Sequence, residues 1–331
     1  MKLSFVIVAA NAAKYIGDCL ASVRAAAAEM TGLAESADII VVDRASTDAT
    51  IRNARDIAPE AVIVEAPAGT GFAAAANLGV ARASGDVIIF VDPAVTLCPG
   101  AARRLAEHMD TTPACMVAGG MVTGPKDAVL RGAARLPGLI VKLARLSGLP
   151  GRLPRTWFNW PAYGEKHFQQ PTRVQAVSLA FAAVKTAALR KLGPLDERFH
   201  GDAFTGHDLC RRIRRAVMFD WNVAVVPQAR ACAQDAFVLR PEIEDFDLNG
   251  DGVVRTRVRD EMLYVWKNYC VLTSLGNSLL ELAGSCVRYA VSALPGIGCD
   301  KCARHNAVVL RETSRAMLDT QLGMQYPTTP W

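Results

Sequence analysis

The sequence predicts an α/β protein in which a mostly parallel, Rossmann-like sheet is flanked by helices and followed by a C-terminal helical appendage. Apolar runs alternate with helix-like segments through the first hundred residues, as βαβ units require. The run at residues 87–91 is wholly apolar, which is typical of a parallel strand covered on both faces. From residue 261 onward, apolar residues recur at helical spacing.

The individual elements follow from these two periodicities. Strands are expected at residues 3–8, 39–42, 62–65, 87–91, 116–122, 174–184 and 223–227. Helices are expected at residues 15–29, 48–57, 73–83, 100–109 and 185–192, and one that opens near residue 204. We expect residues 1–235 to form the sheet domain, residues 236–260 a connector, and residues 261–331 the helical region.

Composition limits the classes of function. The chain has 331 residues, 51% of them hydrophobic, so it can bury a large core. Its net charge of +5 is too small to indicate nucleic-acid binding, for which the chain also carries no motif. An anionic small ligand or a membrane surface is a better match to this charge.

The nine cysteines and the N-terminus bear on location. Cys19, Cys98, Cys115 and Cys210 are scattered, and several of them lie within apolar patterns, where a thiol packs as a small hydrophobe; this favours a reducing compartment. The N-terminal apolar run is short and is interpreted as the first strand. Since no run reaches the roughly 18 to 20 apolar residues of a spanning helix, we expect a cytoplasmic protein that can touch the inner face of a membrane.

Two acidic residues directly follow predicted strands. Asp43 comes after the strand at 39–42, and Asp92 comes after the strand at 87–91. The carboxyl ends of parallel strands share one edge of a sheet, and ligands of open α/β sheets bind at that edge. Asp43 and Asp92 are therefore candidate site residues.

A basic segment interrupts the alternation. Residues 128–164 contain no acid, and their bases are Arg131, Arg135, Lys142, Arg145, Arg152 and Arg155. Leucines at helical spacing precede Trp157, Phe158 and Trp160. The pattern matches an interfacial amphipathic element, and it equally matches a helix packed on its own domain with a solvated basic face. With an apolar stripe between Leu272 and Leu294, this segment suggests docking on anionic lipid.

A short acidic run resembles half of a calcium loop. Asp247, Asn249 and Asp251 have EF-hand spacing, but the twelfth position is Val258 instead of a bidentate acid. A polar turn joining two elements is the alternative. The single pair Cys299 and Cys302 does not indicate zinc.

Five motifs occur in an order that is more specific than any one of them. They are Val6-Ile7-Val8-Ala9-Ala10-Asn11, Ile40 through Asp48, Gly71-Phe72 through Asn77-Leu78-Gly79, Gly85-Asp86 through Asp92-Pro93, and Leu195-Asp196-Glu197-Arg198-Phe199 through Arg212. Over residues 3–227 the set resembles the inverting GT-A-fold glycosyltransferases of family 2, particularly the branch with bacterial rhamnosyltransferases.

The resemblance implies a nucleotide-sugar site. It assigns Asp43 to the nucleotide base, Ala9 and Asn11 to the first-strand loop, and Asn77 and Asp92 to the same pocket. A carboxylate at a strand end is a strong acceptor for an imide N–H. The structural alternatives are an Asx turn or a helix cap for Asp43, and a helix C-cap for Asn77.

The sequence departs from the family at the metal position. The resemblance implies an Asp-x-Asp element that holds the ribose and Mg²⁺ or Mn²⁺, but this chain reads Asp92-Pro93-Ala94. An ion bound through substrate phosphates needs only one or two carboxylates, so Asp92 remains the candidate metal ligand.

A second departure concerns the general base. Thr205 and Gly206 stand where the family has a Glu-Asp pair. The candidate catalytic residues are then His207 and Asp202, together with Asp208 of the Asp-Leu-Cys run. The alternative for His207 is a packed or capping histidine.

Two functions follow as hypotheses. The first is an inverting transfer of sugar from a nucleotide-diphosphate donor to a glycan or lipid-linked acceptor, as in polysaccharide biosynthesis. The second is a catalytically impaired relative that serves as a nucleotide- or glycan-binding or scaffold module, which the substitutions at Ala94, Thr205 and Gly206 suggest.

Overall fold

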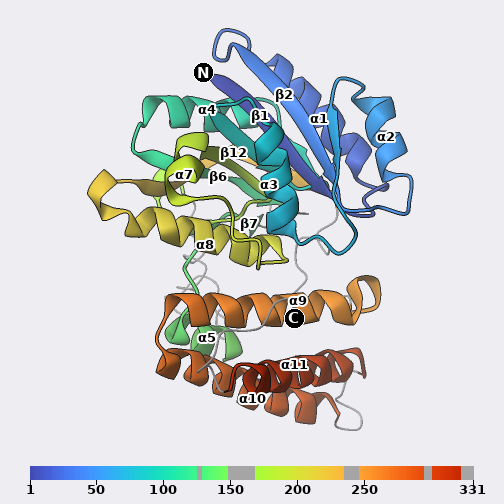
Figure 1. Ribbon diagram of the computed structural model, residues 1–331, viewed down its shortest axis with the longest axis vertical. Coiled ribbons are helices and arrows are strands. Elements are labelled where there is room, and N and C mark those ends of the chain that lie inside the picture. The colour runs from blue at the N-terminus through green and yellow to red at the C-terminus, as the bar shows by residue number, and fades with distance from the viewer. Residues whose placement is uncertain (125–128, 148–167, 235–245, 294–299, 322–331) are drawn as a thin grey trace. The chain divides into compact units, whose positions relative to one another are not determined.

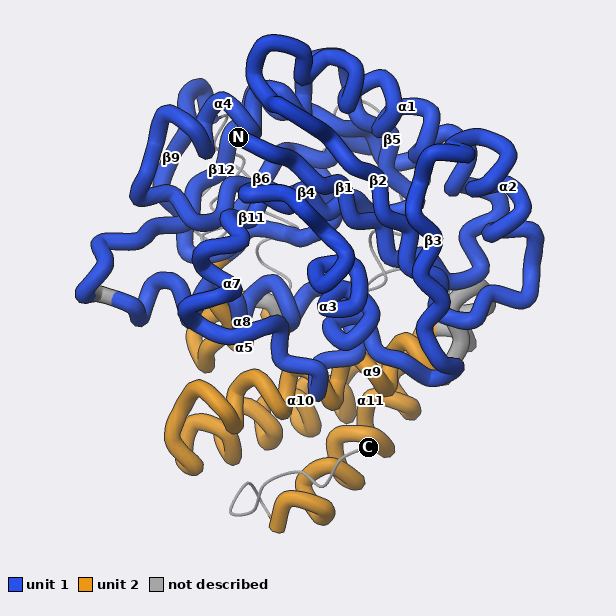
Figure 2. The backbone as a smooth tube through the Cα atoms, turned by 45° about the horizontal axis from the view of Figure 1, so that its top comes forward, with its two compact units in different colours: residues 1–134, 167–239 blue, residues 135–166, 240–331 orange. Residues whose placement is uncertain are grey.

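The computed structural model describes residues 1–124, 129–147, 168–234, 246–293 and 300–321 (Figure 1). Trp157, Phe158, Trp160, Arg152, Arg155, Leu294 and Cys299 lie outside these ranges. The chain forms two compact units (Figure 2). Unit 1 comprises residues 1–134 and 167–239, and unit 2 comprises residues 135–166 and 240–331.

Unit 1 is built on a ten-stranded sheet with the order β3-β2-β1-β4-β11-β6-β12-β5, to which β7 and β9 add at β6 and β12. Its strands are β1 (Lys2–Ala9), β2 (Ser36–Asp43), β3 (Val62–Glu65), β4 (Val87–Val91), β5 (Val95–Leu97), β6 (Cys115–Thr123), β7 (Val129–Arg131), β9 (Thr172–Arg173), β11 (Phe181–Lys185) and β12 (Asn222–Ala233). The pairs among β1, β2, β3 and β4 are parallel, whereas β11 runs antiparallel to both β4 and β6. The predicted α/β class is confirmed.

The helices of unit 1 pack on this sheet. They are α1 (Ile16–Ala28), α2 (Thr50–Ile57), α3 (Phe72–Arg82), α4 (Ala101–Thr111), α7 (Thr186–Leu192) and α8 (Asp202–Arg215). Buried side chains of α1 and α4 form one core with Phe5 and Ile7 of β1. On α3, a Cβ added at Gly79 would lie 2.6 Å from Cγ1 of Val6, so the glycine permits the close approach of this helix to the sheet.

Two predicted strands differ from the observed ones. The apolar run at 174–184 is broken into β10 (Ala176–Val177), which pairs with β8 (Ala133–Ala134), and β11, with a turn between them. Only Gln175 and Ser178 interrupt the apolar residues of this segment, so the turn leaves a weak signal in the sequence. The strand expected at 223–227 continues to Ala233 through a register shift between Val225 and Arg230, where Pro227 has no N–H for the ladder.

Unit 2 is helical in its described residues. Its helices are α5 (Leu139–Leu146), α9 (Phe246–Asn268), α10 (Val271–Ser292) and α11 (Asp300–Asp319). The backbone of α9 is helical through Asp247, Asn249 and Asp251. Because an EF-hand loop must wrap around its ion, the calcium loop is not formed there, and the polar turn is also wrong.

Lys142 corrects the interpretation of the basic segment. Its side chain is only 6% exposed, and its Nζ lies 2.7 Å from Oε1 of Glu261 and also contacts Glu281. The packed-helix alternative expected a solvated basic face and is wrong at Lys142, whereas the interfacial interpretation stays a prediction. Among the described helices, none is long and apolar enough to cross a membrane.

Candidate functional site

The loops that follow β1 and β2 are joined by hydrogen bonds. Ala9 pairs in register with Asp43, and its carbonyl accepts the Arg44 N–H at 2.9 Å. Asn11 has a positive φ of 48°, and its side-chain oxygen accepts the Thr47 N–H at 2.9 Å. The two loops therefore form one ledge at the carboxyl edge of the sheet.

Asp43 lies within this ledge. Its carboxylate is buried and accepts the Ser46 N–H at 3.1 Å, three residues along the chain instead of the two of an Asx turn. A carboxylate has about four acceptor positions, so this bond does not exhaust its capacity. Asp43 combines a rigid position with an acceptor group.

Asp48 fixes the other side of the ledge. Its carboxylate accepts the Ala13 N–H at 3.0 Å and the Thr50 N–H at 2.9 Å. Burial raises its pKa, but these bonds and the one from the Thr50 hydroxyl outweigh that effect and lower the pKa. Asp48 is thus held as the anion by the loop it organises.

Asp92 follows β4 in a tight turn. Its Oδ1 accepts the Ala94 N–H at 2.8 Å, and its own N–H donates to the Ala180 carbonyl at 2.8 Å. Ala94 is buried, and its carbonyl accepts the Gln234 N–H at 2.9 Å. The turn that carries Asp92 is therefore fixed from both neighbouring segments.

A pocket that opens to solvent lies beside this turn, with about 250 Å³ of empty space when the open solvent is included. Its lining comes from the ends of β1 and β4, from the turn before β11, and from the first residues of α3 and α8. The lining residues are Val6, Val8, Phe72, Phe90, Val91, Asp92, Leu179, Ala180 and Asp202. Two carboxylates from distant parts of the chain, Asp92 and Asp202, thus line one pocket.

The carboxylates of Asp92 and Asp202 are the possible metal ligands of this pocket. Among the described residues, no cluster of three or more His, Cys, Asp or Glu side chains could hold an ion. The pocket supplies two carboxylates, and Mg²⁺ or Mn²⁺ bound through substrate phosphates needs one or two. The donor set fits an ion held chiefly by a diphosphate.

The positions of the expected base are closely packed. Thr205 is buried and its hydroxyl donates to the Gly201 carbonyl at 2.6 Å. A Cβ added at Gly206 would lie 3.2 Å from Cγ of Leu179. In this part of α8, packing against the turn before β11 leaves little space for a longer side chain.

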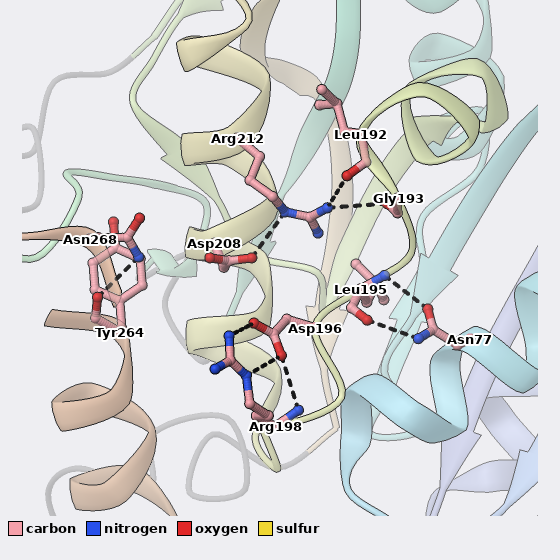
Figure 3. Close-up of polar contacts among 10 residues, drawn as sticks. All are labelled: Asn77, Leu192, Gly193, Leu195, Asp196, Arg198, Asp208, Arg212, Tyr264 and Asn268. Atoms are coloured by element: carbon pink, nitrogen blue, oxygen red, sulfur yellow. Dashed lines mark hydrogen bonds and ion pairs between the residues drawn. The ribbon is translucent and has the colours of Figure 1, made fainter. Parts of the chain in front are cut away.

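The remaining candidates on α8 lie in different surroundings. Asp202 is in the first turn and lines the pocket. His207 is half-buried, and its ring centroid lies 5.6 Å from that of Phe204. Asp208 is buried and accepts from Nε of Arg212 at 3.0 Å, while Nη1 of Arg212 donates to the Leu192 and Gly193 carbonyls (Figure 3). Asp208 thereby secures the end of α7.

Asn77 also serves the scaffold (Figure 3). Its Nδ2 donates to the Leu195 carbonyl at 2.9 Å, and its Oδ1 accepts the Leu195 N–H at 3.0 Å. Because α3 continues to Arg82, the C-cap alternative for Asn77 is wrong. Within the same loop, Asp196 and Arg198 form a two-bond ion pair. Asn77 fixes the loop that leads to α8.

Sequence reasoning missed two residues around Asp92. Phe72 lines the pocket from the start of α3. The Cys19 thiol donates to the Asp92 carbonyl at 3.6 Å, and burial, followed by the Asp92 charge, raises its pKa. Cys19 was correctly expected to pack within an apolar helix, but only the tertiary structure shows which carbonyl it contacts.

The chain is similar to known proteins in both sequence and fold. The family model described as "Glycosyl transferase family 2" matches residues 4–193. Curated proteins give no match.

Two solved structures share the fold. The mannosyltransferase PcManGT from Pyrobaculum calidifontis, in complex with GDP-Man and Mn²⁺, has a TM-score of 0.53 at 13% identity, covering 96% of this chain and 87% of its own. GalNAc-T7 with UDP, GalNAc and Mn²⁺ has a TM-score of 0.56 at 14% identity, covering 99% of this chain and 58% of its own.

Proposed function

The chain belongs to glycosyl transferase family 2, and from this we propose that it transfers a sugar, with inversion, from a nucleotide-diphosphate donor to a glycan or lipid-linked acceptor. The observation that carries the proposal is the shared pocket of Asp92 and Asp202 at the ends of β1 and β4. This edge is where ligands of α/β sheets bind. The nucleotide complexes of PcManGT and GalNAc-T7 support a donor of this class.

The donor would lie along the sheet edge. We place the sugar and diphosphate region beside Asp92 and Asp202, because these two carboxylates line the pocket at the ends of β1 and β4. The nucleotide base would extend over the ledge formed by Ala9, Asn11 and Asp43, where the Asp43 carboxylate can accept an imide N–H. Asn77 would act indirectly, through the loop it holds.

Asp92 is the proposed protein ligand of a divalent ion on the donor. When bound, Mg²⁺ or Mn²⁺ would supply positive charge to the departing diphosphate. Because Asp92 is the one carboxylate at the Asp-x-Asp position, the donor phosphates would be the main ligands of the ion. The protein's own contribution is to hold Asp92 rigidly through the Ala94 and Ala180 contacts.

Asp202 is the proposed general base. The acceptor hydroxyl oxygen would form the new bond to the anomeric carbon as the bond to the diphosphate oxygen breaks, and the hydroxyl proton would pass to Asp202. His207 packs against Phe204, and Asp208 pairs with Arg212, whereas Asp202 lines the pocket. This difference in surroundings selects Asp202 from the three candidates.

The test is an assay of UDP- and GDP-sugars with and without Mn²⁺. Asp202→Asn should lower kcat by about 10²- to 10⁴-fold while nucleotide binding stays unchanged. Asp92→Asn should weaken the Mn²⁺-dependent part of nucleotide binding. Asp56→Asn, at an exposed position of α2, is the matched control and should change neither. Absence of both binding and turnover with every donor would refute the proposal.

The second candidate is a binding or scaffold module without turnover. It is supported by the close packing of Thr205 and Gly206 and by the buried Ala94. Calorimetry that shows nucleotide binding without enhancement by Mn²⁺, together with no turnover, would favour this function. Turnover stimulated by Mn²⁺ would eliminate it.

We place the reaction in the cytoplasm, at the inner face of a membrane, in polysaccharide biosynthesis. The exposed thiols of Cys270, Cys286 and Cys302 support a reducing compartment. A lipid-linked acceptor would account for contact with a membrane. Transfer assays with water-soluble and lipid-linked acceptors compare the two acceptor classes.

A further inference from the structure

Helix α10 buries its polar face and exposes its apolar face, which is the reverse of an ordinary helix in a folded protein. Its buried residues are polar: Ser274, Asn277, Ser278, Glu281 and Ser285. Its opposite face is aliphatic, with Leu272 exposed by 80%, Leu279 by 51% and Val287 by 64%. An amphipathic helix normally buries its apolar stripe.

The buried polar face is fixed by specific partners. Lys142 contacts Glu281, and Nη2 of Arg288 lies 3.1 Å from Oε1 of the same carboxylate. Arg288 also donates to the Ser285 hydroxyl at 2.9 Å and to Oδ1 of Asn306 at 3.1 Å. Turning the apolar face inward would break these contacts and leave charges without partners. The outward direction of the leucines is therefore built into the unit.

Helix α5 extends the same apolar surface. Its Leu139 and Leu146 pack over the glycines of α10, since a Cβ added at Gly276 or Gly284 would lie 3.3 or 2.8 Å from them. On the same helix, Ile140 is 71% exposed and Leu143 is 50% exposed. The α5–α10 surface is defined by Ile140, Leu143, Leu272, Leu279, Val287 and Val291. Exposed aliphatic side chains on two helices that pack together make this a candidate interaction site.

Charge in unit 2 is separated between its inside and its outside. Asp260, Glu281 and Glu312 are buried. Glu312 is ion-paired with arginines on α9 and α11: Arg255, Arg259, Arg311 and Arg315. On α11, Arg304, Arg311 and Arg315 are exposed. Among the described residues of the unit, Asp319 is an exposed acid beside the three exposed arginines Arg304, Arg311 and Arg315, so the described surface of α11 has an excess of positive charge.

We propose that the α5–α10 surface docks on an anionic lipid bilayer and lies in its interface. The aliphatic side chains would enter the boundary between headgroups and acyl chains, and the arginines would attract anionic headgroups. A second copy of the chain is a poorer match, because it would carry the same excess of positive charge. The inference rests on the proposed function only in that a lipid-linked acceptor explains the location.

The test is flotation of the full chain with vesicles. Binding should be strong with phosphatidylcholine mixed with phosphatidylglycerol, weak with phosphatidylcholine alone, and reduced by high salt. Leu279→Glu should weaken binding about tenfold, since burial of one leucine is lost. Met218→Glu is the matched control: Met218 is 85% exposed in unit 1, and its variant should bind like the wild type apart from the charge effect.

A second variant keeps the inference testable if Leu279→Glu does not fold. Arg304→Gln should weaken binding to anionic vesicles about fivefold and leave binding to neutral vesicles unchanged. Equal binding to both vesicle types, or equal effects of Leu279→Glu and Met218→Glu, would overturn the inference. So would a concentration-dependent dimer that Leu279→Glu abolishes.

The outcome is separable from that of the proposed function. Transfer to a water-soluble acceptor is measured on the same preparations. Normal transfer without vesicle binding would overturn the docking surface alone. Vesicle binding without transfer would support the docking surface and contradict the proposed enzyme.

Discussion

Unit 1 and unit 2 use polar side chains in opposite places. In unit 1 the interior is a continuous apolar core around Phe5 and Ile7, and carboxylates such as Asp92 are placed at the sheet edge. In unit 2 the carboxylates of Glu281 and Glu312 are buried and ion-paired, while leucines face outward. Asp92 and Asp202 of unit 1 thus line a pocket, whereas Glu281 and Glu312 of unit 2 hold helices together. A carboxylate in unit 1 can therefore be tested by ligand binding, and a carboxylate in unit 2 by stability.

The largest expected effect comes from removing a buried charge of unit 2. Lys142→Met would leave Glu261 and Glu281 without their shared cation, which should destabilise the unit by about 3 to 5 kcal/mol. Hydrogen exchange of α5 and α10 during urea unfolding measures the change. The double variant Lys142→Met with Glu281→Gln should recover part of the loss. Lys14→Met, at an exposed position in unit 1, should cost no more than about 0.5 kcal/mol.

A smaller effect is expected from acid. Burial, with the charges of Arg257 and Arg288, lowers the pKa of His305 to about 4, against about 6.5 in the unfolded chain. Below pH 6.5 the unfolded chain binds a proton that the folded unit does not, so stability falls as the pH goes from about 6.5 to about 4.

The expected loss is about 3 kcal/mol before solvent screening and about 1 to 2 kcal/mol after it, because His305 is only half-buried. Urea unfolding of unit 2 at several pH values measures the loss. The variant His305→Gln should show a shallower dependence on pH. An identical slope in both proteins would contradict the assignment.

Two conservative substitutions, one in the interior of each unit, compare how much the apolar and the polar interior contribute to stability. Ile7→Val in the core of unit 1 should cost about 0.5 to 1.5 kcal/mol, because a buried methylene is lost. Ser278→Ala in the interior of unit 2 should cost less than about 0.5 kcal/mol, since its hydroxyl donates to the Ser274 carbonyl one turn back in the same helix. Chemical denaturation of both variants gives the two values. A larger loss for Ser278→Ala would contradict the contrast.

The mildest perturbation is thiol labelling at pH 8. Burial raises the pKa of Cys115 to about 11 and of Cys210 to about 12, so these thiols of unit 1 should react only after unfolding. In unit 2, Cys270, Cys286 and Cys302 are exposed and should react at once. Cys232, which is exposed in unit 1, is the internal control and should also react at once. Mass spectrometry of labelled peptides separates these classes.

Local patterns were sufficient for most of the sheet. The strands at 62–65 and 87–91 match β3 and β4 because their apolar runs are bounded by clear breaks. The turn before β11 and the start of α9 were not predicted. The first lies in a largely apolar segment whose only polar residues are Gln175 and Ser178, and the second lies in a polar run. Spacing in the sequence carries no signal for either boundary.

The site was predictable in part for a similar reason. Asp43 and Asp92 follow strands, so their place at the sheet edge could be expected. The scaffold roles of Asn77 and Asp208 depend on Leu195 and on the end of α7, which local periodicity does not connect to them. In unit 2, the exposed stripe from Leu272 was visible as a pattern, but the direction it faces is set by Lys142, whose partners are far away in the chain.

That distance has a consequence for synthesis. Lys142 and Glu261 are 119 residues apart, so α5 leaves the ribosome long before its partners in α9 and α10. At about 5 to 20 residues per second, the gap is roughly 6 to 24 s. During this time Lys142 can be solvated, while Ile140 and Leu143 are free to meet chaperones or a membrane. Unit 2 can reach its native order only after all of unit 1 has been translated, so a chain that ends before α10 would carry an α5 without its partner helix.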